Sequence, residues 1–293
     1  MTSATVSAPA TAATAAAATS PLLQVRDLHV EFSGPRGQFA AVQGVSLDVH
    51  AGRTLCILGE SGSGKSVTLK SMMRLLPPNL QRMRGSIRFD GREVLNMSPA
   101  ELQRLRGAQI AMIFQEPMSA LDPVNTVGST IMQVVRRHQG VSQQQARARA
   151  LELFDMVRIP SAARRLNAYP HELSGGLRQR VMIALALSCQ PSLLLADEPT
   201  TALDATVQIQ ILLLLRELQQ ELGMGMIFVT HDLGAAAEVA DDITVMFQGR
   251  VVERGDAVSL LTAPRAPYTQ ELIASSRLDH LDSLPLPGHA AAA

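Results

Sequence analysis

Gly59-Glu60-Ser61-Gly62-Ser63-Gly64-Lys65-Ser66 is the stretch that decides the fold of this 293-residue chain. It fits the pattern G-x-x-x-x-G-K-S, follows the apolar run LCIL and precedes a helical pattern, which is the context that this motif requires. Glycines let backbone N–H groups turn inward, and the helix that follows adds its positive end, so the loop can hold polyphosphate. We therefore predict a nucleoside triphosphate here, with Lys65 at the β and γ phosphates and Ser66 as a ligand of Mg²⁺.

Short β-like runs alternate with helical patterns on both sides of this loop. The runs are residues 22–32, 41–49, 54–59, 86–90, 110–114, 193–197, 226–230 and 242–247. Helical patterns cover residues 65–76, 127–138, 143–157, 176–188, 204–222 and 233–240. This alternation predicts an α/β domain with a mainly parallel sheet. From about residue 116 to residue 187 the helical patterns follow one another without a clear strand, which predicts a helical insertion.

Composition excludes several classes of protein. The chain has 26 Lys and Arg against 26 Asp and Glu. A protein that binds the phosphate backbone of nucleic acid needs a surplus of positive charge, so this balance argues against that class. No apolar run approaches the ~18–20 residues that span a bilayer, so we expect no membrane span. Two isolated cysteines, Cys56 and Cys189, cannot form a disulfide framework or a zinc site. Residues 1–20 are rich in Ala and Thr and lack the features of a signal peptide, so we expect a disordered tail.

A second apolar run, LLLA, ends in the acidic pair Asp197 and Glu198. In a phosphate-loop fold, the first acid at such a strand end orients Mg²⁺ and the second polarises a water beside the γ phosphate. An acid that caps a helix before Pro199 is the alternative for this pair taken alone. The phosphate loop upstream favours the catalytic interpretation.

A second anion-binding pattern lies upstream of this pair. Leu173, Ser174, Gly175 and Gly176 open an apolar helical pattern, and such an N-terminus binds anions. A chain with one phosphate loop does not need another for the same nucleotide. We therefore expect this segment to serve a nucleotide that another subunit holds.

The order of these motifs resembles that of the ATP-binding cassette (ABC) ATPases across about residues 22–275. Lys65 precedes Gln115 by 50 positions, Ser174 by 109 and Asp197 by 132, and His231 follows Asp197 by 34. The resemblance implies that Gln115 is the Q-loop glutamine, which senses Mg²⁺ and the membrane partner. It likewise implies that Asp204 belongs to the D-loop and that His231 is the switch histidine, which contacts the γ phosphate.

Within that family, several segments are similar to the ATPases of peptide/nickel importers. These segments are GESGSGKSVT, IFQEPMSALDPV, LSGGLRQRVMIALAL with Leu177 at its fifth position, and APRAPYTQEL near the end of the chain. The substrates of such importers include dipeptides, oligopeptides, glutathione and nickel, and this chain does not choose among them. The resemblance favours peptides, and Leu177 favours a paralogous ATPase as the dimer partner over a second copy.

The resemblance also implies a fold and an assembly. The fold is a RecA-like phosphate-loop core with an antiparallel β subdomain and an inserted helical subdomain that carries the signature. We expect an ATPase domain at residues 22–255, its helical subdomain at about 116–187, and a C-terminal extension at 256–293. The implied partners are a second ATPase subunit, two permease subunits and an external substrate-binding protein, with ATP and Mg²⁺ at the cytoplasmic face of the inner membrane.

Two other classes of function compete with transport. An ABC ATPase of DNA repair or translation would carry long coiled-coil insertions, or two cassettes with basic segments, and the sequence has neither. A small-molecule kinase has no use for the signature or for the Asp204 loop.

The resemblance also implies an aromatic ring that stacks on adenine. The family uses an early aromatic residue, for which Phe32 and Phe39 are available. We prefer Phe32 because it follows the first β-like run, and a core role for this ring stays equally open.

Overall fold

The computed structural model describes residues 20–34, 37–78, 81–116, 120–201 and 203–282. The predicted tail, apart from Ser20, and the last eleven residues of the predicted extension therefore lie outside the described residues. The strands are β1 Leu23–Gly34, β2 Gly37–Val49, β3 Thr54–Leu58, β4 Gln81–Phe89, β5 Arg92–Glu93, β6 Ile110–Ile113, β7 Leu193–Asp197, β8 Gly225–Thr230, β9 Asp242–Phe247 and β10 Arg250–Asp256. The α-helices are α1 Lys65–Met72, α2 Pro99–Leu105, α4 Val127–Gln139, α5 Gln143–Met156, α6 Ala162–Arg165, α7 Gly175–Ala186, α8 Ala205–Leu222, α9 Leu233–Val239, α10 Ala257–Thr262 and α11 Pro267–Asp282. Short 3₁₀ helices span Val94–Asn96 and Pro170–Glu172.

Two sheets form the centre of the molecule. The antiparallel sheet has the order β2-β1-β4-β5, and the other has the order β10-β9-β3-β8-β7-β6. Strands β9, β3, β8, β7 and β6 are parallel, whereas β10 runs antiparallel to β9 at the edge. The predicted α/β fold with a mainly parallel sheet is confirmed, and so is the antiparallel sheet that the family resemblance implied.

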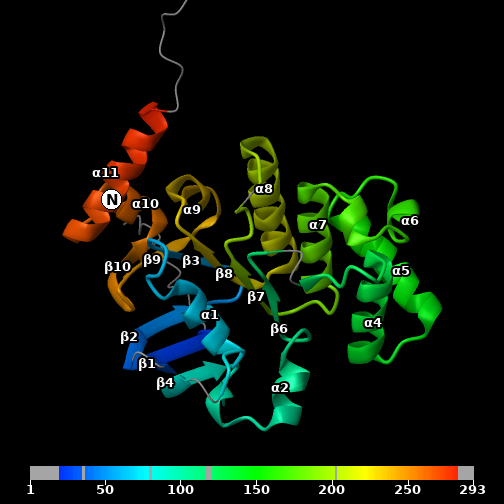
Figure 1. Ribbon diagram of the computed structural model, residues 1–293, viewed down its shortest axis with the longest axis horizontal. Helices are drawn as coiled ribbons and strands as arrows, with labels where there is room; N and C mark the ends of the chain where they lie inside the picture. Colours follow the sequence, from blue (N-terminus) through cyan, green and yellow to red (C-terminus); the bar gives the residue numbers. More distant parts are fainter. Residues whose placement is uncertain (1–19, 35–36, 79–80, 117–119, 202, 283–293) are drawn as a thin grey trace, which may run out of the picture.

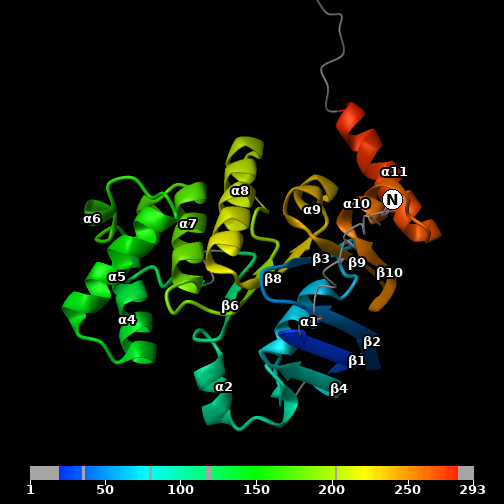
Figure 2. The ribbon, with the colours of Figure 1, turned by 180° about the vertical axis from the view of Figure 1, so that it is seen from behind.

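Helices α4 to α7 gather at one end of the molecule, and α11 lies at the other, as Figures 1 and 2 show from opposite sides. The described residues between 120 and 187 form helices and no strand. Helix α1 ends at Met72, earlier than the pattern predicts, and Arg74 beyond it has a left-handed backbone with φ 49°. Among the described helices, none is both long and apolar enough to span a bilayer.

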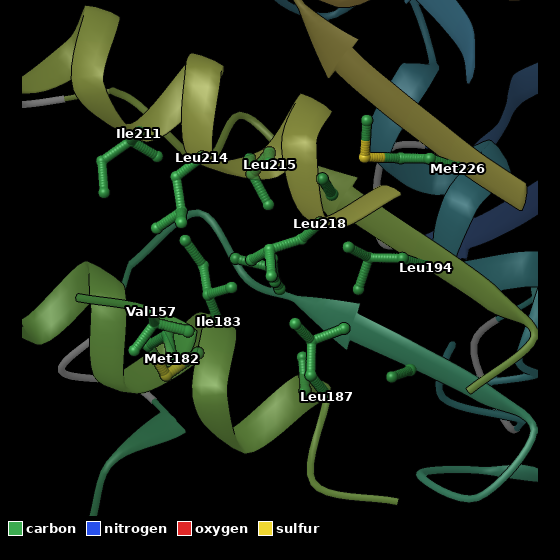
Figure 3. Close-up of a cluster of buried hydrophobic side chains, with 14 of the residues drawn as sticks. Val157, Met182, Ile183, Leu187, Leu194, Ile211, Leu214, Leu215, Leu218 and Met226 are labelled. Carbon is green, nitrogen blue, oxygen red and sulfur yellow. The ribbon is translucent and has the colours of Figure 1, made fainter. Parts of the chain in front are cut away.

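Each parallel strand contributes to two hydrophobic clusters because successive side chains point to opposite faces of a sheet. Leu193 and Leu195 of β7 pack toward the antiparallel sheet and α1. Leu194 and Ala196 pack on the other face, against helices that include α7 and α8. Figure 3 shows this second cluster, in which Leu215 and Leu218 of α8 approach Leu194. The sheet is therefore covered on both faces, and its loops emerge at its edges.

Replacing Leu215 by Ala should test how much the second cluster stabilises the fold. Leu215 is 0% exposed, so the substitution removes buried methyl groups and leaves a cavity. We expect a loss of about 2–5 kcal/mol in the free energy of unfolding, measured by chemical denaturation. The matched control is Leu213→Ala on the same helix, where the side chain is 41% exposed and the change should stay within about 0.5 kcal/mol. Equal losses in the two variants would contradict this account of the core.

Candidate active site

The phosphate loop leaves β3 at Gly59 and ends where α1 begins at Lys65. Gly64 caps α1 in a left-handed conformation with φ 98°, and a Cβ atom there would lie 2.5 Å from the carbonyl oxygen of Ala41. A Cβ on Gly59 would lie 2.2 Å from the carbonyl oxygen of Met246. Both positions therefore require glycine for space as well as for backbone conformation. The end of β9 thus sets the path of the loop.

Lys65 is buried at the centre of this loop and is only 4% exposed. Its Nζ donates to the carbonyl oxygens of Gly59, at 2.6 Å, and Glu60, at 2.8 Å. Burial lowers the pKa of Lys65, and the carboxylates of Glu198 and Asp197 oppose that shift. The Oγ of Ser63 is also buried and has no hydrogen-bond partner among the described residues. A buried cation and an unpartnered hydroxyl at a helix N-terminus are a donor set that fits phosphate.

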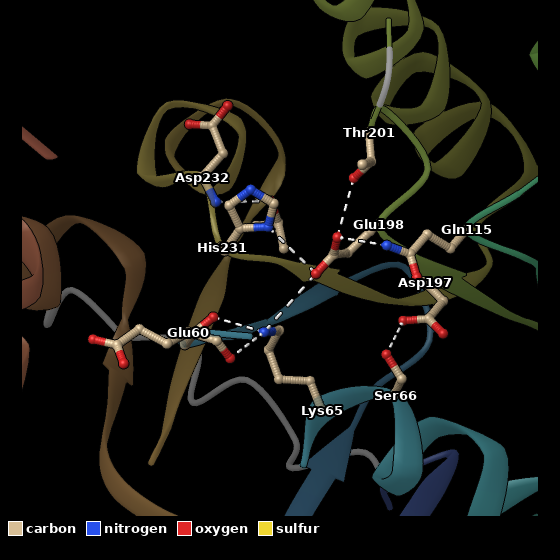
Figure 4. A network of polar contacts seen from close by, with 11 residues as sticks. Glu60, Lys65, Ser66, Gln115, Asp197, Glu198, Thr201, His231 and Asp232 are labelled. Atoms are coloured by element: carbon tan, nitrogen blue, oxygen red, sulfur yellow. Dashed lines mark hydrogen bonds and ion pairs between the residues drawn. The ribbon is translucent and has the colours of Figure 1, made fainter. Parts of the chain in front are cut away.

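Ser66 and Asp197 meet at the carboxyl end of β7, as Figure 4 shows. The Oγ of Ser66 donates to Oδ1 of Asp197 at 2.7 Å, and Asp197 is buried. Burial raises the pKa of Asp197, although the hydrogen bond from Ser66 and the nearby Lys70 act in the opposite direction. Hydroxyl and carboxylate oxygens are the ligands that Mg²⁺ prefers. This pair fits the metal that was predicted for it.

Glu198 is the centre of a network of polar contacts (Figure 4). Its Oε2 accepts hydrogen bonds from Nε2 of Gln115 and Oγ1 of Thr201, each at 3.1 Å. Its Oε1 lies 3.3 Å from Nδ1 of His231 and 3.9 Å from Nζ of Lys65. The backbone of Glu198 has φ 46°, which is uncommon for a residue with a side chain and is typical of functional sites.

The structure thus brings together most of the residues that the sequence singled out. Gln115, His231 and Lys65 each contact Glu198. Gln115 was predicted as a metal-sensing residue, and its side chain donates a hydrogen bond to Glu198. The contact of Thr201 with Glu198 was not predicted, and its position three residues after Glu198, within the turn before α8, was the available signal.

The signature segment forms the N-terminus of α7, away from this network. Ser174 caps the helix by accepting a hydrogen bond from the backbone N–H of Leu177 at 3.4 Å. Asp204 caps α8 in the same way, through the N–H of Val207 at 3.0 Å. A Cβ on Gly176 would lie 2.7 Å from Cγ1 of Val207, so α7 and α8 begin side by side. No hydrogen bond or ion pair between described residues joins Ser174 to the phosphate loop.

Phe32 lies opposite Phe39 in the register of β1 and β2. Phe32 is half-buried and packs against the cluster between the two sheets, whereas Phe39 is 65% exposed. Neither ring belongs to the network around Glu198. Stacking of Phe32 on adenine stays a prediction, and the neighbouring Phe39 is the more accessible of the two rings.

Replacing Asp197 by Asn should stabilise the chain in the absence of nucleotide and metal. A raised pKa in the folded state means that ionised Asp197 destabilises the fold relative to the unfolded chain, at every pH above its unfolded value. Neutral Asn removes this cost, so we expect a gain of about 0.5–2 kcal/mol near pH 7. The gain should shrink as the pH falls through the folded-state pKa, because wild-type Asp197 is then protonated as well.

Urea denaturation at neutral and acidic pH measures this dependence. The matched control is Asp155→Asn on the exposed face of α5, which should change the stability little at either pH. A loss of stability in Asp197→Asn at neutral pH would contradict the assignment.

Comparison with known proteins agrees with this geometry. A family model described as ABC transporter matches residues 42–201. The glutathione import ATP-binding protein GsiA of Salmonella paratyphi A (strain ATCC 9150 / SARB42) is 51% identical over 260 residues, which cover 87% of this chain and 42% of GsiA. This chain therefore spans less than half the length of GsiA.

In two further comparisons, the match covers a larger share of the related protein. The oligopeptide transport ATP-binding protein OppD of Bacillus subtilis (strain 168) is 48% identical over 255 residues, which cover 87% of this chain and 71% of OppD. The dimeric structure of a post-hydrolysis state of the ATP-binding cassette MJ0796, bound to ADP and Pi, superposes with a TM-score of 0.72 at 30% identity. This match covers 80% of the present chain and 98% of the other. With its family match over more than half its length and its close similarity to OppD, this chain belongs to the ABC transporter family.

Proposed function

We propose that this chain hydrolyses ATP to ADP and phosphate in order to drive import through separate membrane subunits. The observation that carries the proposal is the position of Glu198, held at the end of β7 beside Lys65, Gln115 and His231. A carboxylate with these neighbours at the mouth of a phosphate loop has the position of a base for an attacking water. The family to which the chain belongs supports the same reaction.

The phosphate loop, residues 59–66, would hold the triphosphate of ATP. Lys65 and the buried Ser63 hydroxyl would bind phosphate oxygens, and Lys65 would exchange its two backbone carbonyl partners for them. Ser66 and Asp197 would hold Mg²⁺, with Gln115 completing its surroundings. When bound, Mg²⁺ neutralises charge that develops on the phosphate oxygens during transfer.

Glu198 would orient the attacking water and accept its proton while the bond between the γ phosphorus and ADP breaks. His231, whose side chain is 53% exposed, is free to turn from Glu198 toward the γ phosphate. Glu198 is held by four polar neighbours, which fix the position of its carboxylate. Such preorganisation lowers the cost of reaching the transition state.

Replacing Glu198 by Gln should leave ATP binding intact and lower turnover by a factor of about 10²–10⁴, the usual contribution of a general base. The amide keeps the size of the side chain and can still contact Thr201, but it cannot accept the proton. Phosphate release and equilibrium ATP binding should be measured on the same preparation. Glu221→Gln at the exposed end of α8 is the matched control and should hydrolyse ATP at the wild-type rate. Unchanged hydrolysis in Glu198→Gln would refute the role of this carboxylate.

The signature points to a dimer as the active form. Leu173, Ser174, Gly175 and Gly176 form a helix N-terminus that makes no polar contact with the chain's own phosphate loop among the described residues. A second ATPase subunit would place its nucleotide against this end of α7, with Asp204 at the same interface. The similar cassette MJ0796 has a structure described as dimeric, which supports this arrangement. The partner would be a paralogue or a second copy.

The named relatives favour peptides as the transported class. GsiA is named for glutathione import and OppD for oligopeptide transport, and glutathione is itself a small peptide. We infer that this chain serves an importer of dipeptides, oligopeptides or glutathione. It would bind two permease subunits at the cytoplasmic face of the cell membrane and work with an external binding protein. Its helices α4 to α7 would receive a cytoplasmic helix of a permease.

Co-expression with the permease subunits from neighbouring reading frames tests this assembly. The chain should co-purify with them from detergent-solubilised membranes, and Glu198→Gln should co-purify equally because the base is not part of the docking face. In proteoliposomes, ATP hydrolysis should rise when the binding protein is supplied with a di- or oligopeptide or with glutathione. Stimulation by Ni²⁺ alone would overturn the peptide assignment, and association with nucleic acid in place of a permease would overturn transport.

A further inference from the structure

Helix α9 begins two residues after His231, and α8 holds it at both ends. At the N-terminal end, Nε2 of Gln208 donates a hydrogen bond to Oδ2 of Asp232 at 2.7 Å. At the C-terminal end, Nη1 of Arg216 donates to the carbonyl oxygen of Glu238 at 2.7 Å. The first of these contacts lies one residue from the histidine that would meet the γ phosphate.

Asp232 organises the short segment between β8 and α9. Its Oδ1 accepts the backbone N–H groups of Gly234, at 2.7 Å, and Ala235, at 3.2 Å, and so caps α9. Its own N–H donates to Oγ1 of Thr230 at 3.0 Å. These three partners belong to the same stretch of chain, whereas Gln208 lies in a different helix. The contact with Gln208 therefore fixes this segment relative to α8.

Gln208 is itself well placed to hold a neighbour. It is half-buried, and its backbone N–H donates to the carbonyl oxygen of Asp204 at 2.8 Å in the first turn of α8. The residue before it, Val207, packs closely on Gly176 of α7. A carboxylate only accepts hydrogen bonds, so the amide nitrogen of Gln208 has to face Asp232. Gln208 thus links the start of α8, beside the signature, to the segment that carries His231.

The ring of His231 has to turn while its backbone stays in place. The side chain is 53% exposed, and its Nδ1 lies 3.3 Å from Oε1 of Glu198. In Figure 4 the carboxylate of Asp232 points away from Glu198, so the two neighbours on the segment face opposite ways. One side chain faces the site and the other faces its anchor. A displacement of about 1 Å in such a segment can lower a rate by about 10²-fold.

We propose that Gln208 is a positioning residue for His231 and acts through the carboxylate of Asp232. The proposal rests on the proposed function, because it assumes that His231 reaches the γ phosphate of ATP. Loss of the contact would leave the cap of α9 in place, since Oδ1 keeps both backbone N–H groups. The segment would then be free to shift relative to α8, and the ring of His231 would shift with it.

Gln208→Met keeps the length of the side chain and removes the donor. In the assembled importer, we expect kcat to fall about ten- to a hundredfold, which is the range for one hydrogen bond to a charged group. The Kd for ADP should stay at the wild-type value, because ADP lacks the γ phosphate. The matched control is Gln220→Met at the exposed far end of α8, which should hydrolyse ATP at the wild-type rate. A wild-type kcat in Gln208→Met would overturn the proposal.

An exchange of donor and acceptor separates a lost contact from a lost fold. Gln208→Glu alone places two carboxylates together, and their repulsion should lower kcat at least as much as Gln208→Met. Adding Asp232→Asn restores a hydrogen bond of reversed polarity, because the new amide can donate to the new carboxylate and its oxygen can still cap α9. The double variant should recover most of the lost rate. A rate no higher than that of Gln208→Glu would contradict the assignment.

A double-mutant cycle tests whether the effect passes through His231. In the background of His231→Ala, Gln208→Met should cause little further loss of rate, because the group that it positions is already gone. A structural defect elsewhere would lower the rate by the same factor in both backgrounds. Equal factors would therefore overturn the proposal.

A spectroscopic measurement on the full chain does not depend on hydrolysis. The chain has seven histidines, and in ¹⁵N-histidine-labelled protein the signal of His231 is the one lost in His231→Ala. This signal should move in Gln208→Met and stay in place in Gln220→Met. An unmoved signal would overturn the positioning role. A moved signal in a chain whose wild type does not hydrolyse ATP would keep the contact and overturn the proposed function instead.

Discussion

The parallel register of β3, β8, β7 and β6 is the constraint on which the site depends. Ile113 pairs with Ala196, Asp197 with Val229, and Leu58 with Thr230. Because these strands run the same way, the segments that follow them emerge at one edge, where Lys65, Gln115, Glu198 and His231 meet. A slip of one residue would exchange the two faces of a strand, and each face is buried in a different cluster. The packing of the apolar side chains therefore also fixes the positions of the polar side chains that follow these strands.

The buried charged groups of the site lie where their ionised forms are less stable than in water. Burial lowers the pKa of Lys65 and raises that of Asp197, so each group is less readily charged here than in water. The left-handed backbone of Glu198 adds strain at the same point. The two hydrophobic clusters offset these costs, because a well-packed core can support a few unfavourable positions. A site organised in this way keeps its charges close to where phosphate and metal would use them.

Much of this could be predicted from the sequence because it depends on local patterns. Apolar runs mark the five parallel strands, and a glycine-rich motif between a strand and a helix marks the phosphate loop. Strand β10 was missed because Arg250–Asp256 is polar and half-exposed at a sheet edge, where no apolar run is needed. Helix α2 was missed because Pro99–Leu105 is short, although Ser98 and Glu101 form a capping box that indicated it. The contact of Thr201 with Glu198 depends on a turn whose geometry has no simple sequence pattern.

The phosphate loop is shaped by segments that are distant from it in sequence. The carbonyl oxygen of Met246 leaves no room for a side chain at Gly59, and the backbone N–H of Gly249 donates to the carbonyl oxygen of Ser63. The motif alone specifies a loop that can bind phosphate, but it does not specify how ordered that loop is before phosphate arrives. Both contacts come from the end of β9 and the turn after it, which lie far from the loop in the sequence. Tyr268 of α11 packs on Phe247 at this strand end, so the C-terminal helix lies next to the segment that shapes the loop.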